Sequence, residues 1–177
     1  MDVFTEEKRS AVMSRIHSKD TGPEKVVRRL LSRAGFRYRL QSAALPGRPD
    51  LVLSKWRTVV FVNGCFWHMH SGCRLASRPE SRTDYWLPKL ERNRRRDLEN
   101  ERVLIASGWR VLVVWECACK KKHQLGALQA RMAAFIRNDS GQEGSFLSLG
   151  AAELEAAARA SSPKETQEKP ARSPAPS

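Results

Sequence analysis

The segment Trp109–Trp115 constrains the fold of this chain more than any other, because it is a nearly unbroken apolar run of strand length. Such a run is typical of a central strand whose two faces are both covered by other elements. Thr58–Val62 is a second apolar run of the same kind, flanked by charged residues. Both runs are far too short to span a membrane. The two runs therefore predict a sheet buried between layers of helices.

Start and stop signals place the other elements around this sheet. Thr21-Gly-Pro-Glu24 has the pattern of a capping box, with a proline in the first turn, and predicts a helix that ends near Gly35. Asp50–Ser54 and Arg57–Asn63 read as two strands of a hairpin. We also expect a basic amphipathic helix over 5–17, an extended segment at Arg37–Leu40, a long charged helix from about Trp86–Pro88 to Ser107, a helix over His123–Asn138 and an edge strand at Phe146–Leu149.

The expected fold class is therefore α/β (α+β), with a mixed sheet flanked by helices. The 177 residues are enough for one domain, which we place at 1–150. Residues 151–177 read as a disordered Ala/Pro-rich tail in which Ala151–Ala160 forms at most a marginal helix. This tail contains four basic and four acidic residues, so the net charge of +13 belongs to the domain. A domain this basic is expected to bind a polyanion.

The predicted hairpin contains the first candidate site. Asp50 precedes its first strand, and Val62-Asn63 ends the second. Nucleases hold Mg²⁺ with a carboxylate in this position, because hard divalent cations prefer oxygen ligands. The acidic residue and lysine that the second strand of such hairpins commonly supplies are absent, since Phe61, Val62 and Asn63 occupy those places. The competing interpretation is that Asp50 only ends the turn Leu45-Pro-Gly-Arg-Pro.

A second candidate site lies in the irregular segment after this hairpin. Cys65, His70 and Cys73 fall within nine residues, and Cys117 and Cys119 follow far downstream. Cys65, His70 and Cys73, together with the thiol of either Cys117 or Cys119, would form a tetrahedral zinc site. This site would hold the loop against the end of the Trp109–Trp115 strand. Four protein ligands leave no open position, so such a zinc would be structural. Unmetallated thiols and surface histidines remain the alternative.

Aromatic and basic residues surround this loop. Phe66, Trp67, Tyr85 and Trp86 either fill a core or insert between base pairs of a duplex. The charged helix carries Lys89, Asn93 and Arg96, which suit phosphate contacts as well as a solvated face. His68, between the predicted metal hairpin and the zinc loop, is a candidate general base. Glu24 has a structural role available to it in the capping box.

Taken together, these residues resemble the very short patch repair endonucleases over about residues 5–149. The resemblance is carried by Glu24, Leu45-Pro-Gly-Arg-Pro-Asp50, Val60-Phe-Val-Asn-Gly-Cys-Phe-Trp-His68, Thr83-Asp-Tyr-Trp86, Lys89, Asn93, Arg96-Asp97 and Gly108-Trp-Arg-Val-Leu-Val-Val-Trp-Glu-Cys117. Members of that family are bacterial enzymes with a restriction-endonuclease-like core. They nick DNA 5′ to the thymine of a T:G mismatch left by deamination of 5-methylcytosine.

The resemblance also implies roles for individual residues. It implies Mg²⁺ on Asp50 and on the backbone carbonyl of Val62, with Glu24 acting through water and His68 as the catalytic histidine. It implies zinc on Cys65, His70, Cys73 and Cys117, and DNA intercalation by Phe66, Trp67 and Trp86. Double-stranded DNA with a T:G mismatch is then the expected partner, in the bacterial cytoplasm near the nucleoid, with mismatch-repair and resynthesis proteins acting afterwards. Nicking one strand needs only a monomer.

This chain departs from the family pattern at the hairpin, in the loop that follows it, and in the tail after Gly150, for which the pattern has no counterpart. Val62-Asn63 stands where the pattern has Thr-His, so the second catalytic position holds an amide that cannot transfer a proton. The loop between His68 and Cys73 is one residue longer, which makes His70 the poorest match to the pattern among the four zinc ligands. Cys119 is an alternative fourth thiol. Two other functions stay open on these grounds: a zinc-stabilised DNA-binding module with a decayed nuclease hairpin, and a nuclease of the same fold that cuts an unmodified site.

Overall fold

The computed structural model describes residues 20–40, 43–77, 79, 82–138 and 145–161. The helix expected over 5–17 lies outside these residues, as does the end of the chain after Ser161. The helices are α2 (Gly22–Arg33), α3 (Thr83–Ala106), α4 (Glu116–Lys120), α5 (Leu125–Arg137) and α6 (Ala151–Ser161). The strands are β1 (Arg39–Leu40), β2 (Leu51–Leu53), β3 (Thr58–Asn63), β4 (Arg110–Trp115) and β5 (Phe146–Leu149).

The five strands form one mixed sheet in the order β1-β2-β3-β4-β5. Strands β1, β2 and β3 pair antiparallel, and β2 and β3 form the expected hairpin. Strands β3, β4 and β5 pair parallel, with Val60 opposite Leu112 and Val113 opposite Ser148. The predicted fold class is thus confirmed, and β4 is the fully buried inner strand that its apolar run indicates.

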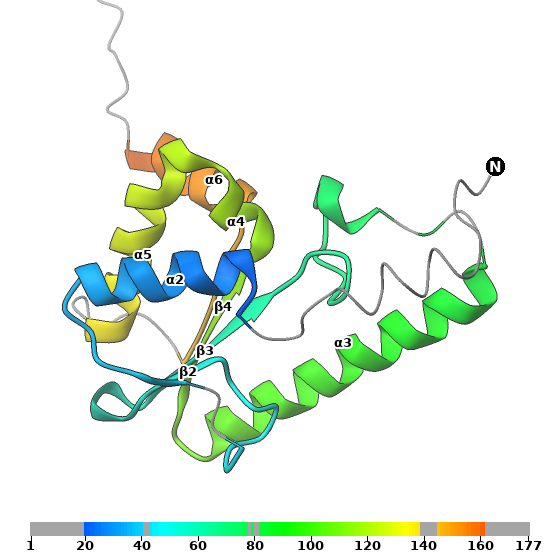
Figure 1. Ribbon diagram of the computed structural model, residues 1–177, viewed down its shortest axis with the longest axis horizontal. Helices are drawn as coiled ribbons and strands as arrows, with labels where there is room; N and C mark the ends of the chain where they lie inside the picture. The colour runs from blue at the N-terminus through cyan, green and yellow to red at the C-terminus, as the bar shows by residue number, and fades with distance from the viewer. Residues whose placement is uncertain (1–19, 41–42, 78, 80–81, 139–144, 162–177) are drawn as a thin grey trace, which may run out of the picture.

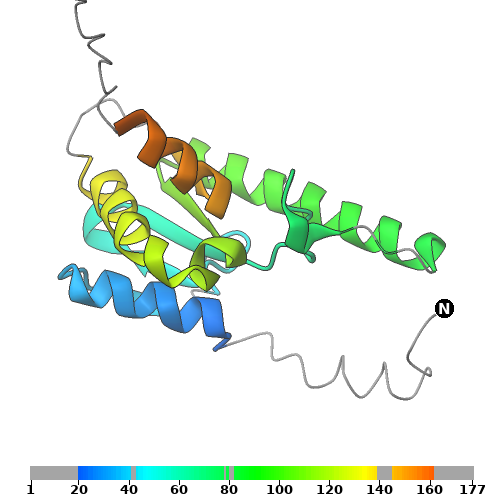
Figure 2. The ribbon, with the colours of Figure 1, turned by 90° about the horizontal axis from the view of Figure 1, so that it is seen from above.

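Side chains alternate between the two faces of this sheet. One core contains Val60, Leu112 and Val114 together with residues of α2, α5 and α6. The other contains Val59, Val111 and Val113, which pack against Leu104 of α3. Figures 1 and 2 show α2 and α3 on opposite sides of the sheet, with the first half of α3 extending beyond it. Both faces of β4 are therefore covered, which explains why its sequence is apolar at consecutive positions.

Helix α3 begins earlier than the sequence indicates. It starts at Thr83, three residues before the expected boundary, so Pro88 lies inside it. A proline within a helix removes one backbone donor, here the partner of the Asp84 carbonyl. Asp84 is exposed, so water can take that place. Proline was therefore a poor marker of this helix start.

The other differences lie at the end of β4 and after residue 150. Strand β4 runs directly into the short helix α4, which the sequence analysis did not foresee and which contains Cys117 and Cys119. Helix α6 packs onto the domain through Leu154, which is only 2% exposed and belongs to the larger core. The folded part of the chain therefore continues to Ser161 rather than ending at residue 150. Within the described residues, no helix is long and apolar enough to cross a membrane.

Candidate functional site

The β2–β3 hairpin brings Asp50 against the backbone of Val62. The Val62 N–H donates a hydrogen bond of 2.7 Å to Asp50 Oδ2. Leu51, the first residue of β2, lies opposite Val60 in the antiparallel pair. Val62 therefore lies past the first residue of β2, beside the segment that contains Asp50. The N–H and C=O of one strand residue face the same neighbour. The carbonyl of Val62 therefore points to the same side as the Asp50 carboxylate, as the hairpin hypothesis requires.

The tight turn before Asp50 depends on Gly47. Its φ of +72° lies in the left-handed region, and a Cβ there would approach the Asn100 side chain of α3 to 3.0 Å. Glycine adopts this conformation without the steric penalty of other residues. The turn therefore rests directly on α3, which fixes where the hairpin begins and where Asp50 lies.

Asp50 occupies an environment that disfavours its charge. Burial raises the pKa of its carboxyl to about 6, although the Val62 hydrogen bond acts in the opposite direction. The charge of Glu24 raises this pKa further, while those of Arg28 and His68 lower it. A half-buried carboxylate with a second carboxylate nearby is stabilised by a cation, and such perturbed groups are typical of functional sites.

Replacing Asp50 with asparagine is expected to stabilise the metal-free protein at alkaline pH. The folded-state pKa lies above the unfolded value of 3.8, so the proton-linked stability of the wild type is present at low pH and lost as pH rises through about 6. Asparagine carries no charge, so the variant should gain on the order of 2 kcal/mol above that pH. Thermal unfolding in chelator across the pH range measures this, and a stability difference that does not change with pH would contradict it.

Glu24 is buried but fully engaged in local structure. Its carboxylate accepts hydrogen bonds from the hydroxyl and backbone of Thr21, which completes the predicted capping box. It also pairs with Arg28 at 2.7 Å. Both oxygens therefore have protein partners, and Glu24 caps the start of α2 as the sequence predicts. Its charge nevertheless reaches Asp50, as the pKa of that residue shows.

His68 is paired with a residue to which the sequence analysis gave no role. Its Nδ1 lies 2.5 Å from Asp97 Oδ2, and both side chains are about three-quarters buried. Asp97 comes from the middle of α3, so 29 residues separate the two partners. A carboxylate at Nδ1 orients the imidazole and leaves Nε2 for proton transfer. The only sequence signal for this pair was the position of Asp97 beside Arg96 in the quoted motif.

Asn63 occupies the last position of β3, opposite Trp115 of β4, and is buried. It lies two residues from Cys65 and next to Val62, so the strand places it between the hairpin and the loop. An amide can hold a hydrogen bond at this point but cannot exchange a proton.

The second candidate site forms as a compact cluster. The ligand atoms of Cys65, His70, Cys73 and Cys117 all lie within 4.8 Å of one another. His70 Nδ1 is 3.6 Å from Cys65 Sγ and 3.5 Å from Cys117 Sγ. The hydrogen bond between Cys65 and Cys117 lowers the pKa of the Cys117 thiol and raises the pKa of the Cys65 thiol. The thiols of Cys65 and Cys117 therefore influence each other directly.

These distances fit a tetrahedral metal centre. With metal–sulfur bonds near 2.3 Å and metal–nitrogen bonds near 2.0–2.1 Å, sulfur and nitrogen ligands lie about 3.6 Å apart. Three sulfurs and one imidazole nitrogen are a donor set that Zn²⁺ prefers. Cys119, the alternative fourth thiol, lies instead in the hydrophobic core, where burial raises its pKa to about 12. Cys117 is therefore the fourth candidate ligand, because α4 places Cys119 in the core, away from the loop.

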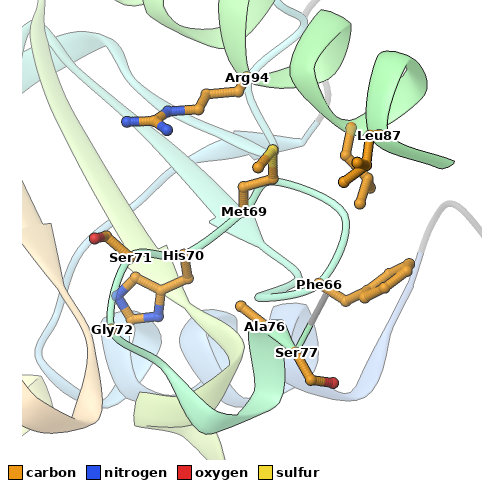
Figure 3. A pocket seen from close by; sticks show the side chains of 10 residues that line it. Phe66, Met69, His70, Ser71, Gly72, Ala76, Ser77, Leu87 and Arg94 are labelled. Atoms are coloured by element: carbon orange, nitrogen blue, oxygen red, sulfur yellow. The ribbon is translucent and has the colours of Figure 1, made fainter. Parts of the chain in front are cut away.

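The loop between β3 and α3 has almost no hydrophobic core of its own. Of residues 64–77, only Cys65 and His70 are buried. A cavity of about 230 Å³, lined by Phe66, Met69, Leu87 and Leu90 among others, lies between this loop and α3 (Figure 3). Met69 has a φ of +52°, an uncommon value for a non-glycine residue, and it separates His68 from His70. The two histidines thus reach different partners, Asp97 and the sulfur cluster.

The predicted DNA-binding residues gather at the first half of α3. The rings of Phe66, Trp67 and Trp86 pack against one another with centroids 5.2–5.8 Å apart. Trp86 is 9% exposed, so Phe66 and Trp67 present more of this aromatic cluster to the outside. The Lys89 ammonium lies 5.4 Å from the Trp86 ring.

Asn93 and Arg96 follow on the same helix. The Asn93 amide donates to the Trp67 carbonyl at 3.3 Å and so holds the loop, while Arg96 is exposed. The basic side chains and the aromatic rings therefore share one edge of the molecule.

Comparison with known proteins connects this geometry to a function. The family described as DNA mismatch endonuclease Vsr matches residues 1–74. The type II nicking enzyme V.XorIIP of Xanthomonas oryzae is 51% identical over 131 residues, which cover 74% of this chain and 93% of that protein. V.NmeAIP of Neisseria meningitidis is 52% identical over 121 residues, or 68% and 86% of the two chains. The DNA mismatch endonuclease Vsr of Escherichia coli is 43% identical over 137 residues, or 76% and 87%.

Proposed function

The chain belongs to the Vsr family of DNA mismatch endonucleases, and we propose that it nicks one strand of duplex DNA 5′ to the thymine of a T:G mismatch. The Asp50–Val62 contact at the start of the hairpin carries this proposal, because it places a half-buried carboxylate beside the Val62 backbone, whose carbonyl faces the same side. The proposed place of action is the bacterial cytoplasm. Proteins that resynthesise and seal the nicked strand would act next.

We propose that Asp50 and the carbonyl of Val62 hold Mg²⁺. Both are oxygen donors, and burial together with the charge of Glu24 raises the pKa of Asp50, so a cation beside it would stabilise the ionised form. A bound Mg²⁺ would offset the negative charge that develops on the scissile phosphate. Glu24 would act on the metal indirectly, through water, since its oxygens already contact Thr21 and Arg28. Asn63 would orient a reacting group through its amide.

His68 is the proposed general base. Its Nε2 would take a proton from the attacking water, and Asp97 at Nδ1 would stabilise the imidazolium that forms. The water oxygen bonds to phosphorus as the bond to the 3′ oxygen breaks, which leaves a 3′-hydroxyl and a 5′-phosphate. The charge of His68 lowers the pKa of the Asp50 carboxyl, which supports this assignment.

The aromatic cluster and α3 supply the proposed contact with the mismatch. Phe66, Trp67 and Trp86 would insert beside the T:G pair, which costs less than opening a matched step because a mismatch stacks poorly. Lys89 and Arg96 would bind phosphates, as the charge of +13 favours. Zn²⁺ on Cys65, His70, Cys73 and Cys117 would hold the loop that carries Phe66 and Trp67.

A nicking assay with a labelled duplex tests this function. The substrate carries a T:G mismatch in a CT(A/T)GG-type context, and the matched duplex is its control. We expect a single Mg²⁺-dependent nick 5′ to the mismatched thymine, which chelation with EDTA abolishes. Equal cleavage of the matched duplex would indicate a restriction-type nuclease instead. Tight binding without cleavage in Mg²⁺ or Mn²⁺ would indicate a binding module with a decayed hairpin.

Removing His68 or its partner should slow the chemical step. We expect His68→Ala to reduce single-turnover nicking by about 10²–10⁴-fold, the usual contribution of a general base. Asp97→Asn should give a smaller loss, because the imidazole remains but its orientation and its positive form are less stabilised. Glu91→Gln, which changes an exposed carboxylate on the same helix, is the matched control. Unchanged rates in both variants would exclude this pair from the reaction.

A further inference from the structure

The first turn of α6 lies directly on the sulfur cluster. The backbone N–H of Ala151 donates to Cys117 Sγ at 3.3 Å. The side chain of Glu153, two residues later, places Oε1 3.6 Å from Nε2 of His70. Helix α6 thus contacts two of the four candidate ligands, and it does so from a segment that begins 34 residues beyond Cys117 in the chain.

The two nitrogens of His70 face different groups. Nδ1 faces the sulfurs of Cys65 and Cys117, whereas Nε2 faces the carboxylate of Glu153. The ring itself is stacked on Trp115, with an interplanar angle of 6° and centroids 4.2 Å apart. An ionised carboxylate only accepts hydrogen bonds, so it favours the tautomer with the hydrogen on Nε2. That tautomer directs the Nδ1 lone pair toward the cluster.

Gly150 makes the approach of α6 possible. A Cβ at this position would lie 2.5 Å from Cε1 of His70 and 2.5 Å from Oε2 of Glu153. No side chain fits at such distances without displacing one of these two groups. The close packing of Gly150, His70 and Glu153 is therefore a specific junction between α6 and the cluster.

We propose that Glu153 is a positioning residue for His70, and that metal binding at the cluster and docking of α6 stabilise each other. The proposal rests on the metal site of the proposed function. A carboxylate that fixes the tautomer and orientation of a ligating histidine raises its affinity for the metal. The Ala151 N–H offsets part of the negative charge that three thiolates place around a divalent ion. Metal binding in turn gives α6 a rigid surface.

The affinity for Zn²⁺, measured by competition with a chromogenic chelator, tests the role of Glu153. We expect Glu153→Ala to weaken binding about tenfold or more, as loss of such a partner does in other metal sites. Glu153→Gln keeps an acceptor oxygen and should recover most of the affinity. Arg159→Ala is the matched control, because Arg159 lies on the same helix, is exposed and pairs with Glu155 within α6. Equal affinity in wild type and Glu153→Ala, or an equal loss in Arg159→Ala, would overturn the proposal.

Hydrogen exchange of the amides in 151–161 tests the coupling in the other direction. We expect Zn²⁺ to slow exchange across α6 in the wild type and to have a smaller effect in Glu153→Ala. Without metal, the two proteins should unfold at similar temperatures, which separates positioning from simple loss of helix packing. Wild-type protein that binds no Zn²⁺ would refute the metal site itself. Wild-type protein that binds Zn²⁺ with unchanged exchange in α6 would refute only the coupling.

Discussion

Replacing Asp50 with asparagine is expected to abolish nicking while DNA binding persists. The carboxylate is the only acidic side chain that touches the backbone of Val62 among the described contacts of the hairpin. Asparagine keeps the size and one acceptor but removes the charge that a divalent cation requires. Loss of several kcal/mol of transition-state stabilisation corresponds to a rate lower by on the order of 10³. Single-turnover cleavage of the mismatched duplex and a binding titration measure the two properties separately.

The control for Asp50 must account for charge. Removing any carboxylate from a basic protein strengthens its binding to a polyanion. An Asp50 variant should therefore bind DNA as well as wild type or somewhat better. Glu99→Gln removes an exposed carboxylate from α3 and should bind similarly and cleave normally. If Asp50→Asn lost binding together with cleavage, Asp50 would have a structural role in the hairpin instead.

Replacing Cys73 with serine is expected to remove the metal dependence of the stability. Because residues 64–77 bury only Cys65 and His70, the cluster takes the place of a hydrophobic core in this loop. A ligand present at a thousandfold excess over its Kd stabilises the folded state by about 4 kcal/mol. For a domain of this size, that corresponds to a melting temperature higher by about 10 °C. Thermal unfolding with Zn²⁺ and with chelator should show this difference in the wild type and not in Cys73→Ser.

Cys119→Ala provides the matched control, since Cys119 is buried in the core next to the cluster without belonging to it. This variant should unfold at a lower temperature in both conditions, because it leaves a small cavity, yet keep its response to Zn²⁺. Purified wild type with no bound zinc, and with the same melting temperature in chelator, would contradict the assignment of the cluster as a metal site.

Local sequence patterns identified the elements whose cause is local. The capping box at Thr21–Glu24 forms as expected, because both of its hydrogen bonds join residues three positions apart. The hairpin formed from β2 and β3 and the buried strand β4 also follow from short apolar patterns. The start of α3 was placed too late, because Pro88 suggested a boundary that the solvent-exposed Asp84 carbonyl does not require.

The candidate sites are built from residues that lie far apart in the sequence, and local patterns could not pair these residues. The spacing of Cys65, His70 and Cys73 indicated a metal loop, but the choice between Cys117 and Cys119 needed the turn from β4 into α4. The pairing of His68 with Asp97 and the contact of Glu153 with His70 join residues 29 and 83 positions apart, and no periodicity marks them. Asp97 looked like one charge among many on a long charged helix.

The sequence by itself determined the basic, mixed α/β character of the domain, the hairpin that presents Asp50 and the composition of the metal loop. These follow from residue type, charge and short-range hydrogen bonding, which act within a few positions. Only the tertiary structure decided which side chains meet across elements: Asp97 at His68, Cys117 at the loop, and Glu153 behind His70. Such contacts depend on how helices pack against a sheet, because packing sets the distances between residues that the chain itself leaves far apart.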